Sequence, residues 1–426
     1  DIPRQRHFRR GDGQPAIRQI MRGAEQPLRI QRPQQIAQLG QTGQGHAMAI
    51  SNLDPLGAVF MAKGIATQHQ PARQAMPLLI RMFTIALGFS AGCLAAGLSY
   101  PFLAKLVVPE DFGSLGELEL TVTLVPFVAI WAVAWWVLSL STALALALAL
   151  ANAAFLFRLF IIQHDCGHGS LFRNRRLCDW IGRVIGVITL TPYDVWRKTH
   201  AIHHATSGNL DRRGIGDLPV LTVREYRGKG WPGRALYRLV RHPVFLFGVV
   251  PFYTFFLHNR LPVHLMRSGW RYWLSAMATN AAIGLTLAVI VLLGGWEVLL
   301  FVFLPTMLLA AIAGMWFFYV QHQFEETSWR HEEDWNIQDA SLHGSSHYAL
   351  PGILRWITGN IGVHHVHHLA SRIPFYRLGD VIKDHDILAQ TRSITLWESF
   401  RCARLHLWDE KSRRLLSFAE ARALPA

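Results

Sequence analysis

Two long stretches with almost no charged residues constrain the fold of this chain more than any other feature. No Lys, Arg, Asp or Glu occurs from Leu120 to Leu156, and only Glu297 interrupts the stretch from Tyr272 to Gln323. Apolar runs of about 18 residues or more predict helices that cross a bilayer. The sequence therefore predicts four membrane spans, at residues 120–140, 142–162, 274–293 and 298–320.

The third and fourth stretches have one alternative interpretation, a buried hairpin inside a large soluble core. A hairpin at the surface of a soluble protein needs a charged outer face, and this stretch has none. The composition agrees with spans, because 51% of the residues are hydrophobic and only 16% are charged. The predicted fold class is all-α, an integral membrane protein with four transmembrane helices.

The distribution of the net charge of +14 indicates the orientation of these spans. From His164 to Arg271 there are 17 Lys and Arg against six Asp and Glu, and this block lies between the two pairs of spans. Short loops rich in Lys and Arg stay on the cytoplasmic side, so the loops near Ser141 and residues 294–297 lie outside. A basic surface facing anionic lipids explains the charge. Phosphate-loop and zinc-finger spacings are absent, so we expect no nucleic acid partner.

The N-terminal part of the chain differs from the rest. Residues 1–77 are rich in Gln, Arg, Gly and Pro, which predicts a disordered or mis-annotated extension, with Met61 as a plausible true start. Residues 78–119 form a linker with a hydrophobic segment at 82–104. That segment has three open interpretations, which are a fifth span, a re-entrant or interfacial segment, and a cleavable signal.

The remaining residues, 120–426, are predicted to form one membrane domain. Its polar parts, 163–272 and 321–426, form a helical cap on the cytoplasmic side. Within the cap the segment VFLFGVVPFYTFFL is too short to cross a bilayer and predicts an interfacial helix. Four cysteines show no CxxC pair, which favours reduced thiols. We expect the protein in a membrane, most simply the inner membrane of a bacterium.

Histidines gather in three short motifs. The stretch FRLFIIQHDCGHGSLF places His164 and His168 where the second span ends, WRKTHAIHHATSGNLDRRGIGD has an HxxHH motif, and GNIGVHHVHHLASRIPFY repeats it. Residues at i, i+3 and i+4 share one face of a helix. Each motif therefore presents two or three imidazoles in one direction. His322, in WFFYVQHQFEETSW, leaves the end of the fourth span in the same way.

Topology predicts that these histidines meet. The first two motifs follow the second span, and two further crossings return the chain to the same side before the third motif. Nine imidazoles exceed what one ion can use, so two metal ions are implied, and nitrogen ligands suit iron, zinc or copper. The nine candidate ligands are His164, His168, His200, His203, His204, His322, His364, His367 and His368.

Other polar residues near the motifs are candidates for supporting roles. A metal-binding imidazole normally donates its second N–H to a carboxylate or a carbonyl. Of four nearby acids, Asp165, Asp211, Asp217 and Glu325, we select Asp165 and Asp211. We interpret His365 as a neighbour rather than a ligand, and the roles of His343 and His347 stay open. The remaining histidines outside the motifs are assigned to surface or core positions.

Four stretches resemble the integral-membrane fatty acid desaturases. HDCGHGS, HAIHHATSGNLDRRGIGD, FYVQHQFEETSW and GNIGVHHVHHL are especially similar to the acyl-lipid omega-6 and omega-3 branch of bacteria and plastids. The likeness runs from about Leu120 to Trp408, and the N-terminal residues lie outside it. His343 and His347 in SLHGSSHYALP depart from the pattern of relatives.

The resemblance implies a non-haem centre of two iron ions held by histidines. Such a centre uses O2 and two electrons to place a cis double bond in an acyl chain of a membrane lipid, and the family's histidine on the fourth span corresponds to His322. Acid–base side chains cannot break an alkyl C–H bond, so the implied redox metal agrees with the chemistry required. Four tryptophans are candidates for lining the path of the acyl chain, with core packing as the simpler interpretation: Trp131, Trp135, Trp136 and Trp316.

The electrons must come from a partner. The sequence contains no haem-binding HPGG, no cysteine spacing for an iron–sulfur cluster and no GxGxxG after a strand. We therefore expect a ferredoxin or a cytochrome b5-like donor, docking on basic patches such as 173–176 or 224–241.

Two other functions remain open from the sequence alone. A related di-iron membrane enzyme, such as a lipid hydroxylase, an alkane hydroxylase or a carotenoid ketolase, uses similar histidine motifs. A transition-metal transporter is a more distant alternative, although transporters keep ionisable ligands near the middle of the membrane. Here every motif lies at or beyond the end of a predicted span.

Overall fold

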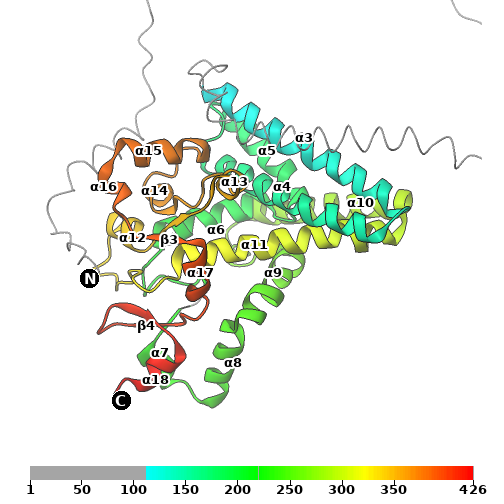
Figure 1. The fold of residues 1–426 in the computed structure, drawn as a ribbon. Coiled ribbons are helices and arrows are strands. Elements are labelled where there is room, and N and C mark those ends of the chain that lie inside the picture. Colours follow the sequence, from blue (N-terminus) through cyan, green and yellow to red (C-terminus); the bar gives the residue numbers. More distant parts are fainter. Residues whose placement is uncertain (1–111, 219, 426) are drawn as a thin grey trace, which may run out of the picture.

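The computed structural model describes residues 112–218 and 220–425, and these residues fold mainly as helices (Figure 1). Three helical stretches in this part of the chain are long and apolar enough to cross a membrane: 115–138, 142–168 and 270–322. The predicted extension at 1–77 and the hydrophobic segment at 82–104 lie outside the described residues, as does most of the predicted 78–119 linker.

The first two stretches form a helical pair. Helix α3 spans Phe112–Leu138 and α4 spans Thr142–His168, with a short turn between them. Ser141 caps the start of α4, because its hydroxyl accepts a hydrogen bond from the backbone N–H of Leu144 at 3.3 Å. Helix α3 covers residues 120–138 of the predicted span 120–140. Helix α4 covers the whole predicted span 142–162 and continues six residues further to His168.

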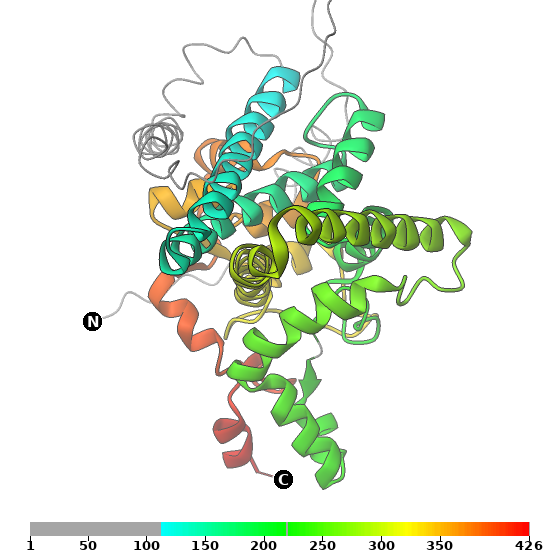
Figure 2. The same cartoon turned by 90° about the vertical axis from the view of Figure 1, so that its right-hand side faces the viewer.

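The third stretch contains both of the remaining predicted spans. It consists of α10 (Trp270–Val298), a π-helical turn η4 (Leu299–Phe303) and α11 (Leu304–His322). Gly295 breaks the helical geometry with φ 76° and ψ 178°, a conformation that an L side chain rarely adopts. In Figure 2, α10 runs across the view whereas α11 is seen end-on, so the chain changes direction at this bend. The bend lies between the predicted spans 274–293 and 298–320.

Small side chains let the long helices pack closely. Ala145 and Ala149 of α4 are buried against Val298 and Val302 of the third stretch. The hydroxyl of Thr306 donates to the carbonyl of Ala149 at 3.0 Å. These contacts fix α11 beside α4, and Figure 1 shows both helices pointing toward the same side of the molecule, where the cap lies.

The cap consists of short helices wrapped around the ends of α4 and α11. A segment of helical turns connects it to α10: η1 (Phe245–Val249), α9 (Val250–Phe252), η2 (Tyr253–Leu257) and η3 (His258–Arg260). This segment corresponds to the predicted interfacial helix. The cap helices are α5 (Arg175–Ile188), α6 (Tyr193–Thr206), α7 (Val223–Gly228), α8 (Trp231–Arg241), α12 (Ile337–His343), α13 (Gly352–Ile357), α14 (His364–Leu369), α15 (Leu378–Asp384), α16 (Asp386–Ala389), α17 (Leu396–Cys402) and α18 (Phe418–Ala423), with a 3-10 turn η5 at Phe375–Arg377.

Two small sheets in the cap depart from the all-α prediction. One has the order β1-β4-β5, with β1 parallel to β4 and β4 antiparallel to β5. The other pairs β2 and β3 in parallel. These strands have two or three residues each, which is too short for an alternating pattern to appear in a sequence. Their bounds are β1 Leu221–Thr222, β2 His347–Ala349, β3 Ser393–Thr395, β4 Leu407–Asp409 and β5 Arg414–Leu416.

Candidate metal centre

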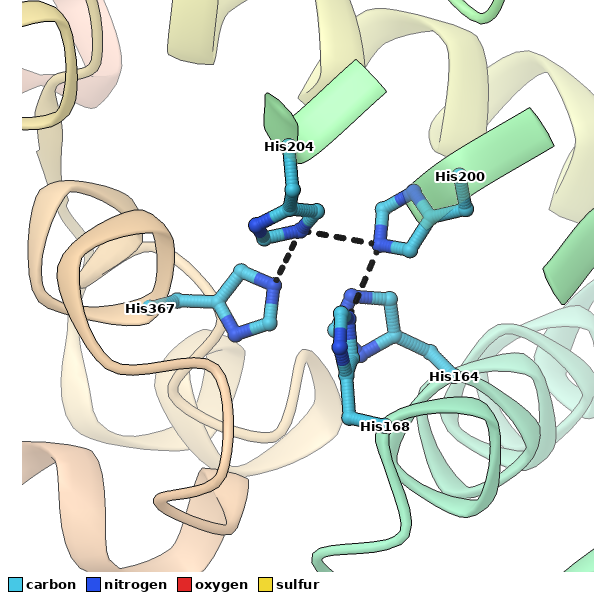
Figure 3. Close-up of side chains that lie close together, drawn as sticks. All are labelled: His164, His168, His200, His204 and His367. Carbon is cyan, nitrogen blue, oxygen red and sulfur yellow. Dashed lines mark hydrogen bonds between the residues drawn. The ribbon is translucent and has the colours of Figure 1, made fainter. Parts of the chain in front are cut away.

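Five of the predicted histidines form one group at the junction of α4, α6 and α14, which we call group one (Figure 3). Their candidate ligand atoms all lie within 4.8 Å of one another. The Nε2 atom of His200 lies 3.0 Å from that of His168 and 3.1 Å from that of His204, whose Nε2 lies 3.1 Å from that of His367. Group one comprises His164, His168, His200, His204 and His367.

The other four histidines form group two, built from α6, α11 and α14. The Nε2 atom of His322 lies 3.1 Å from that of His203 and 3.0 Å from that of His364. The Nε2 atom of His368 lies 3.1 Å from that of His364. The two groups adjoin, because the rings of His204 and His368 stack with centroids 4.2 Å apart.

Helical geometry explains how the motifs are divided between the groups. We expected each motif to point in one direction, but His203 points to group two whereas its neighbours His200 and His204 belong to group one. Residues at i and i+4 differ by about 40° around a helix, and adjacent residues differ by about 100°. In the same way, His367 belongs to group one, whereas His364 and His368, which are four residues apart, belong to group two. Each HxxHH motif therefore bridges both groups.

Local structure places the first pair of histidines. His164 and His168 occupy the last turns of α4, which ends at Gly169 with φ 70°. A Cβ at Gly169 would lie 1.9 Å from Nη1 of Arg175, so this left-handed turn is both sterically and conformationally suited to glycine. The helix therefore stops directly after the second candidate ligand.

Burial keeps five of the candidate ligands neutral. Removal from water lowers the pKa well below the usual 6.5, and neighbouring imidazoles lower it further, for five histidines of α6 and α14: His200, His204, His364, His367 and His368. A metal ion binds the neutral imidazole. The site is therefore prepared for a cation rather than for protonation.

Three of the nine rings are oriented through their second nitrogen. The carboxylate of Asp165 lies 3.0 Å from Nδ1 of His164, and it also accepts a hydrogen bond from the backbone N–H of Phe375 at 2.7 Å. The carboxylate of Asp217 lies 2.5 Å from Nδ1 of His203. The carbonyl of Gly344 lies 3.1 Å from Nδ1 of His322. Each contact leaves Nε2 free to face its group.

The structure does not place Asp211 at these histidines, which corrects the sequence expectation. Its carboxylate contacts the ring of His331 at 2.9 Å and accepts from the backbone N–H of Glu332. Asp217 occupies the position that we had assigned to Asp211. Left-handed turns at Gly214 (φ 120°) and Gly216 (φ 75°) direct the chain back toward α6 and explain this difference. Glu325 pairs with Arg414 and also lies away from both groups.

The additional histidines stay outside the two groups. Nε2 of His365 lies 3.0 Å from the carbonyl of Leu388, and its ring packs near that of His347. His343 pairs with Asp339. The structure thus agrees with their exclusion from the candidate ligand set.

A cavity of about 280 Å³ reaches both groups from the helical stem. His164 and His200 of group one and His364 of group two are among the residues that line it. Most of its other walls are apolar side chains of α4 and α11, including Leu156, Phe157, Phe160, Met307, Ala311, Met315 and Phe318. Such walls suit a hydrocarbon and exclude water from the metal groups.

The four predicted tryptophans are not among the residues that line this cavity. Trp131 and Trp135 pack in the cluster between α3, α4 and η4, and Trp316 packs against Phe247 and Phe400. These contacts agree with core packing, the simpler of the two interpretations of these tryptophans. Trp196 lines the cavity instead and stacks on His200 with ring centroids 4.7 Å apart. Its position four residues before His200, about one helical turn earlier on α6, was the available signal.

Comparisons with known proteins identify the family of this chain. The family model described as fatty acid desaturase matches residues 140–393, which is more than half of the chain. A protein of Bacillus subtilis (strain 168) named fatty acid desaturase is 40% identical over 323 residues, covering 76% of this chain and 91% of that protein.

Two proteins of a Synechocystis strain are more distant relatives. The sn-1 acyl-lipid omega-3 desaturase (ferredoxin) is 29% identical, and the match covers 52% of this chain and 61% of that protein. The sn-1 oleoyl-lipid 12-desaturase is 28% identical, with 51% and 62% covered. The match thus spans about three-fifths of the length of each of these two relatives.

Proposed function

The chain belongs to the fatty acid desaturase family and is therefore an oxidoreductase, and from that premise we propose that its nine clustered histidines hold two iron ions. The observation that carries this proposal is the convergence of the Nε2 atoms in two adjoining groups. All candidate ligands are nitrogen atoms, which suits a transition metal. When bound, the two ions would supply the oxidising chemistry that uses O2 and two electrons to remove hydrogen from an unactivated CH2–CH2 pair.

Membership of the fatty acid desaturase family supports iron as the metal. Neighbouring Nε2 atoms in both groups are 3.0–3.1 Å apart, which is close enough for adjacent imidazoles to bind one ion at about 2.1 Å.

We propose that the cavity binds the acyl chain of a membrane lipid and presents one CH2–CH2 pair to both groups. The apolar side chains of α4 and α11 orient the chain and keep water from the reacting carbons. The names of the Synechocystis relatives support an acyl-lipid carrier and an omega-6 or omega-3 position. Expression of the full chain in a host rich in mono-unsaturated lipid, followed by profiling of fatty acid methyl esters, tests this function. A new di-unsaturated product is expected, and a hydroxylated or ketone product would favour the related enzymes instead.

The cavity gives a test with a matched control. Gly314 lines it, and a Cβ at this position would meet nothing within 4 Å. We expect Gly314→Leu to fill the open space and lower product formation about tenfold or more, because a displaced acyl chain loses its position at the metal groups. Product is measured by methyl ester analysis and bound iron by elemental analysis.

Gly284→Leu is the control for this substitution. Gly284 is also a helical glycine with open space around it, but it lies on exposed α10, away from the cavity. We expect unchanged product with Gly284→Leu and unchanged iron with both variants. Equal product from the two variants would contradict the assignment of the cavity.

Asp217 and Asp211 form a second matched pair. We expect Asp217→Asn to weaken metal binding about 10- to 100-fold, because the hydrogen-bond partner of a metal-binding imidazole orients the ring and raises its basicity. The measurement is iron retained by the purified protein against increasing concentrations of a chelator. Asp211→Asn should leave retention unchanged, and the reverse order would show that Asp211 is the supporting carboxylate.

We also propose that the chain crosses the membrane four times, with the turn at Gly295 outside and the cap in the cytoplasm of a bacterial cell. The basic loops of the cap support this orientation. Electrons come from a ferredoxin or a cytochrome b5-like protein. The exposed patch at 173–176 lies directly after His168, and Nη2 of Arg175 donates to the carbonyl of Gly167 at 2.9 Å, so a donor bound there is close to group one.

A further inference from the structure

A second pocket, of about 400 Å³, lies in the cap between α7, α8 and α18. Four arginines and three aromatic rings contribute to its walls, and no acidic residue is among the residues that line it. We call it the arginine pocket, and its lining residues are Val223, Tyr226, Arg227, Trp231, Arg234, Ala235, Arg238, Phe418, Ala421 and Arg422.

The positive charges of this pocket are not neutralised by partners within the described residues. Arg227 donates to the backbone carbonyls of Ala421 and Leu424, which holds α18 in place. Arg238 donates to the hydroxyl of Tyr226 at 2.6 Å and lies over the ring of Phe418. These partners are uncharged.

The two remaining arginines have no partner for their guanidinium groups in this part of the chain. Arg234 and Arg422 are both exposed, and neither guanidinium makes a hydrogen bond or an ion pair with a described residue. A pocket with four guanidinium groups and no acid strongly favours an anion. The planar guanidinium fork suits the oxygens of a phosphate group.

The opposite face of α8 is apolar and exposed. Arg234 and Arg238 share one exposed face at helical spacing, and Leu236 and Leu239 lie on the other face with exposed fractions of 62% and 52%. A basic amphipathic helix of this kind typically lies in the plane of a membrane interface, with its apolar side chains among the acyl chains.

The position of α8 agrees with an interface. Figure 1 shows α8 leaving the α9 segment beside α11 and running across the direction of α11, toward the lobe that contains α7, β4 and α18. If α11 crosses a bilayer, α8 runs along its surface. The apolar run that follows α8 is also exposed, with Val244 at 74% and Val249 at 47%. With Leu236 and Leu239 toward the acyl chains, the long side chains of Arg234 and Arg238 on the opposite face extend to the level of the lipid phosphate groups.

We propose that the arginine pocket binds the phosphate of an anionic phospholipid, while Leu236 and Leu239 contact the acyl chains of the surrounding lipid. The site is separate from the metal groups and the central cavity, and the proposal does not depend on the reaction that the protein catalyses. It assigns the basic segment 224–241 to lipid rather than to an electron-donor protein.

The full-length protein, purified in detergent, provides the test. Phosphatidylglycerol, phosphatidylcholine or inorganic phosphate is added, and bound molecules are counted by native mass spectrometry while thermal unfolding is followed in parallel. We expect phosphatidylglycerol to bind and raise Tm, and the double variant Arg234→Glu/Arg422→Glu to weaken that binding about tenfold or more. Arg372→Glu/Lys411→Glu changes the net charge equally at two exposed cap residues outside the pocket and should bind as the unmodified protein does.

Three results would overturn the proposal. Equal binding of phosphatidylglycerol to both double variants would show that the pocket is not the site. An equal effect of inorganic phosphate would show a site for the free anion. Loss of reduction by ferredoxin with unchanged lipid binding would show a protein interface. If the Glu variant does not fold, Arg234→Gln/Arg422→Gln removes the same charges more mildly, and unchanged lipid binding by that variant would equally contradict the proposal.

Discussion

Alanine in place of His203 or His367 should reduce formation of the unsaturated product to background. Each substitution removes one imidazole from a different group, because His203 belongs to group two and His367 to group one. Loss of either ring leaves an incomplete set of nitrogen ligands beside an intact one. We therefore expect both ions to be needed, and each single variant to be as inactive as the double variant.

Two measurements check this prediction. Methyl ester profiles of the expressing host report product, and elemental analysis of the purified protein reports bound metal, which should fall in both variants. His343→Ala is the control, since His343 is exposed and pairs only with Asp339 among the described residues. Full product from either His203→Ala or His367→Ala would contradict a two-ion site.

Removing the carboxylate of Glu119 should destabilise the protein strongly. Glu119 on α3 and Arg158 on α4 form an ion pair with each residue only 1% exposed. Arg158 also donates to Thr123 at 3.1 Å and to the carbonyl of Trp356 on α13, and its guanidinium lies 4.3 Å from the centre of the Trp356 ring. The pair thus connects both helices of the stem to the cap.

A buried charge that loses its partner costs about 3–5 kcal/mol. Glu119→Gln should accordingly lower Tm in detergent by several degrees, whereas Glu119→Leu/Arg158→Met should recover most of the loss, since an apolar pair of similar size leaves no charge unpaired. Glu117→Gln is the control, because Glu117 is exposed on the same helix and makes no ion pair with a described residue. If Glu119→Gln and Glu117→Gln unfold at the same temperature, the ion pair does not hold the stem and cap together.

The long apolar helices and the histidine groups were accessible from sequence because their signals are strong and local. Uncharged runs identify helices through composition alone, and the predicted topology places the motifs that contain the nine histidines on one side. The bend at Gly295 was foreseen only as a loop between two spans. The chain is helical on both sides of Gly295. No polar loop therefore marks the position of the bend in the sequence.

The features that were missed depend on contacts between distant parts of the chain. The choice of Asp217 over Asp211 depends on turns at Gly214 and Gly216, and Gly216 packs against Thr199 and His203 of α6. The partner of Arg158 was not predicted, because Glu119 lies 39 residues earlier and outside the uncharged run. The arginine pocket arises only when α18 folds back against α8.

The metal content of the purified full-length protein tests the central claim most directly. We predict about two iron ions per chain, lost in parallel from His203→Ala and His367→Ala and retained in His343→Ala. Active protein that contains one ion per chain, or only zinc, would contradict the assignment of the two histidine groups as a di-iron centre.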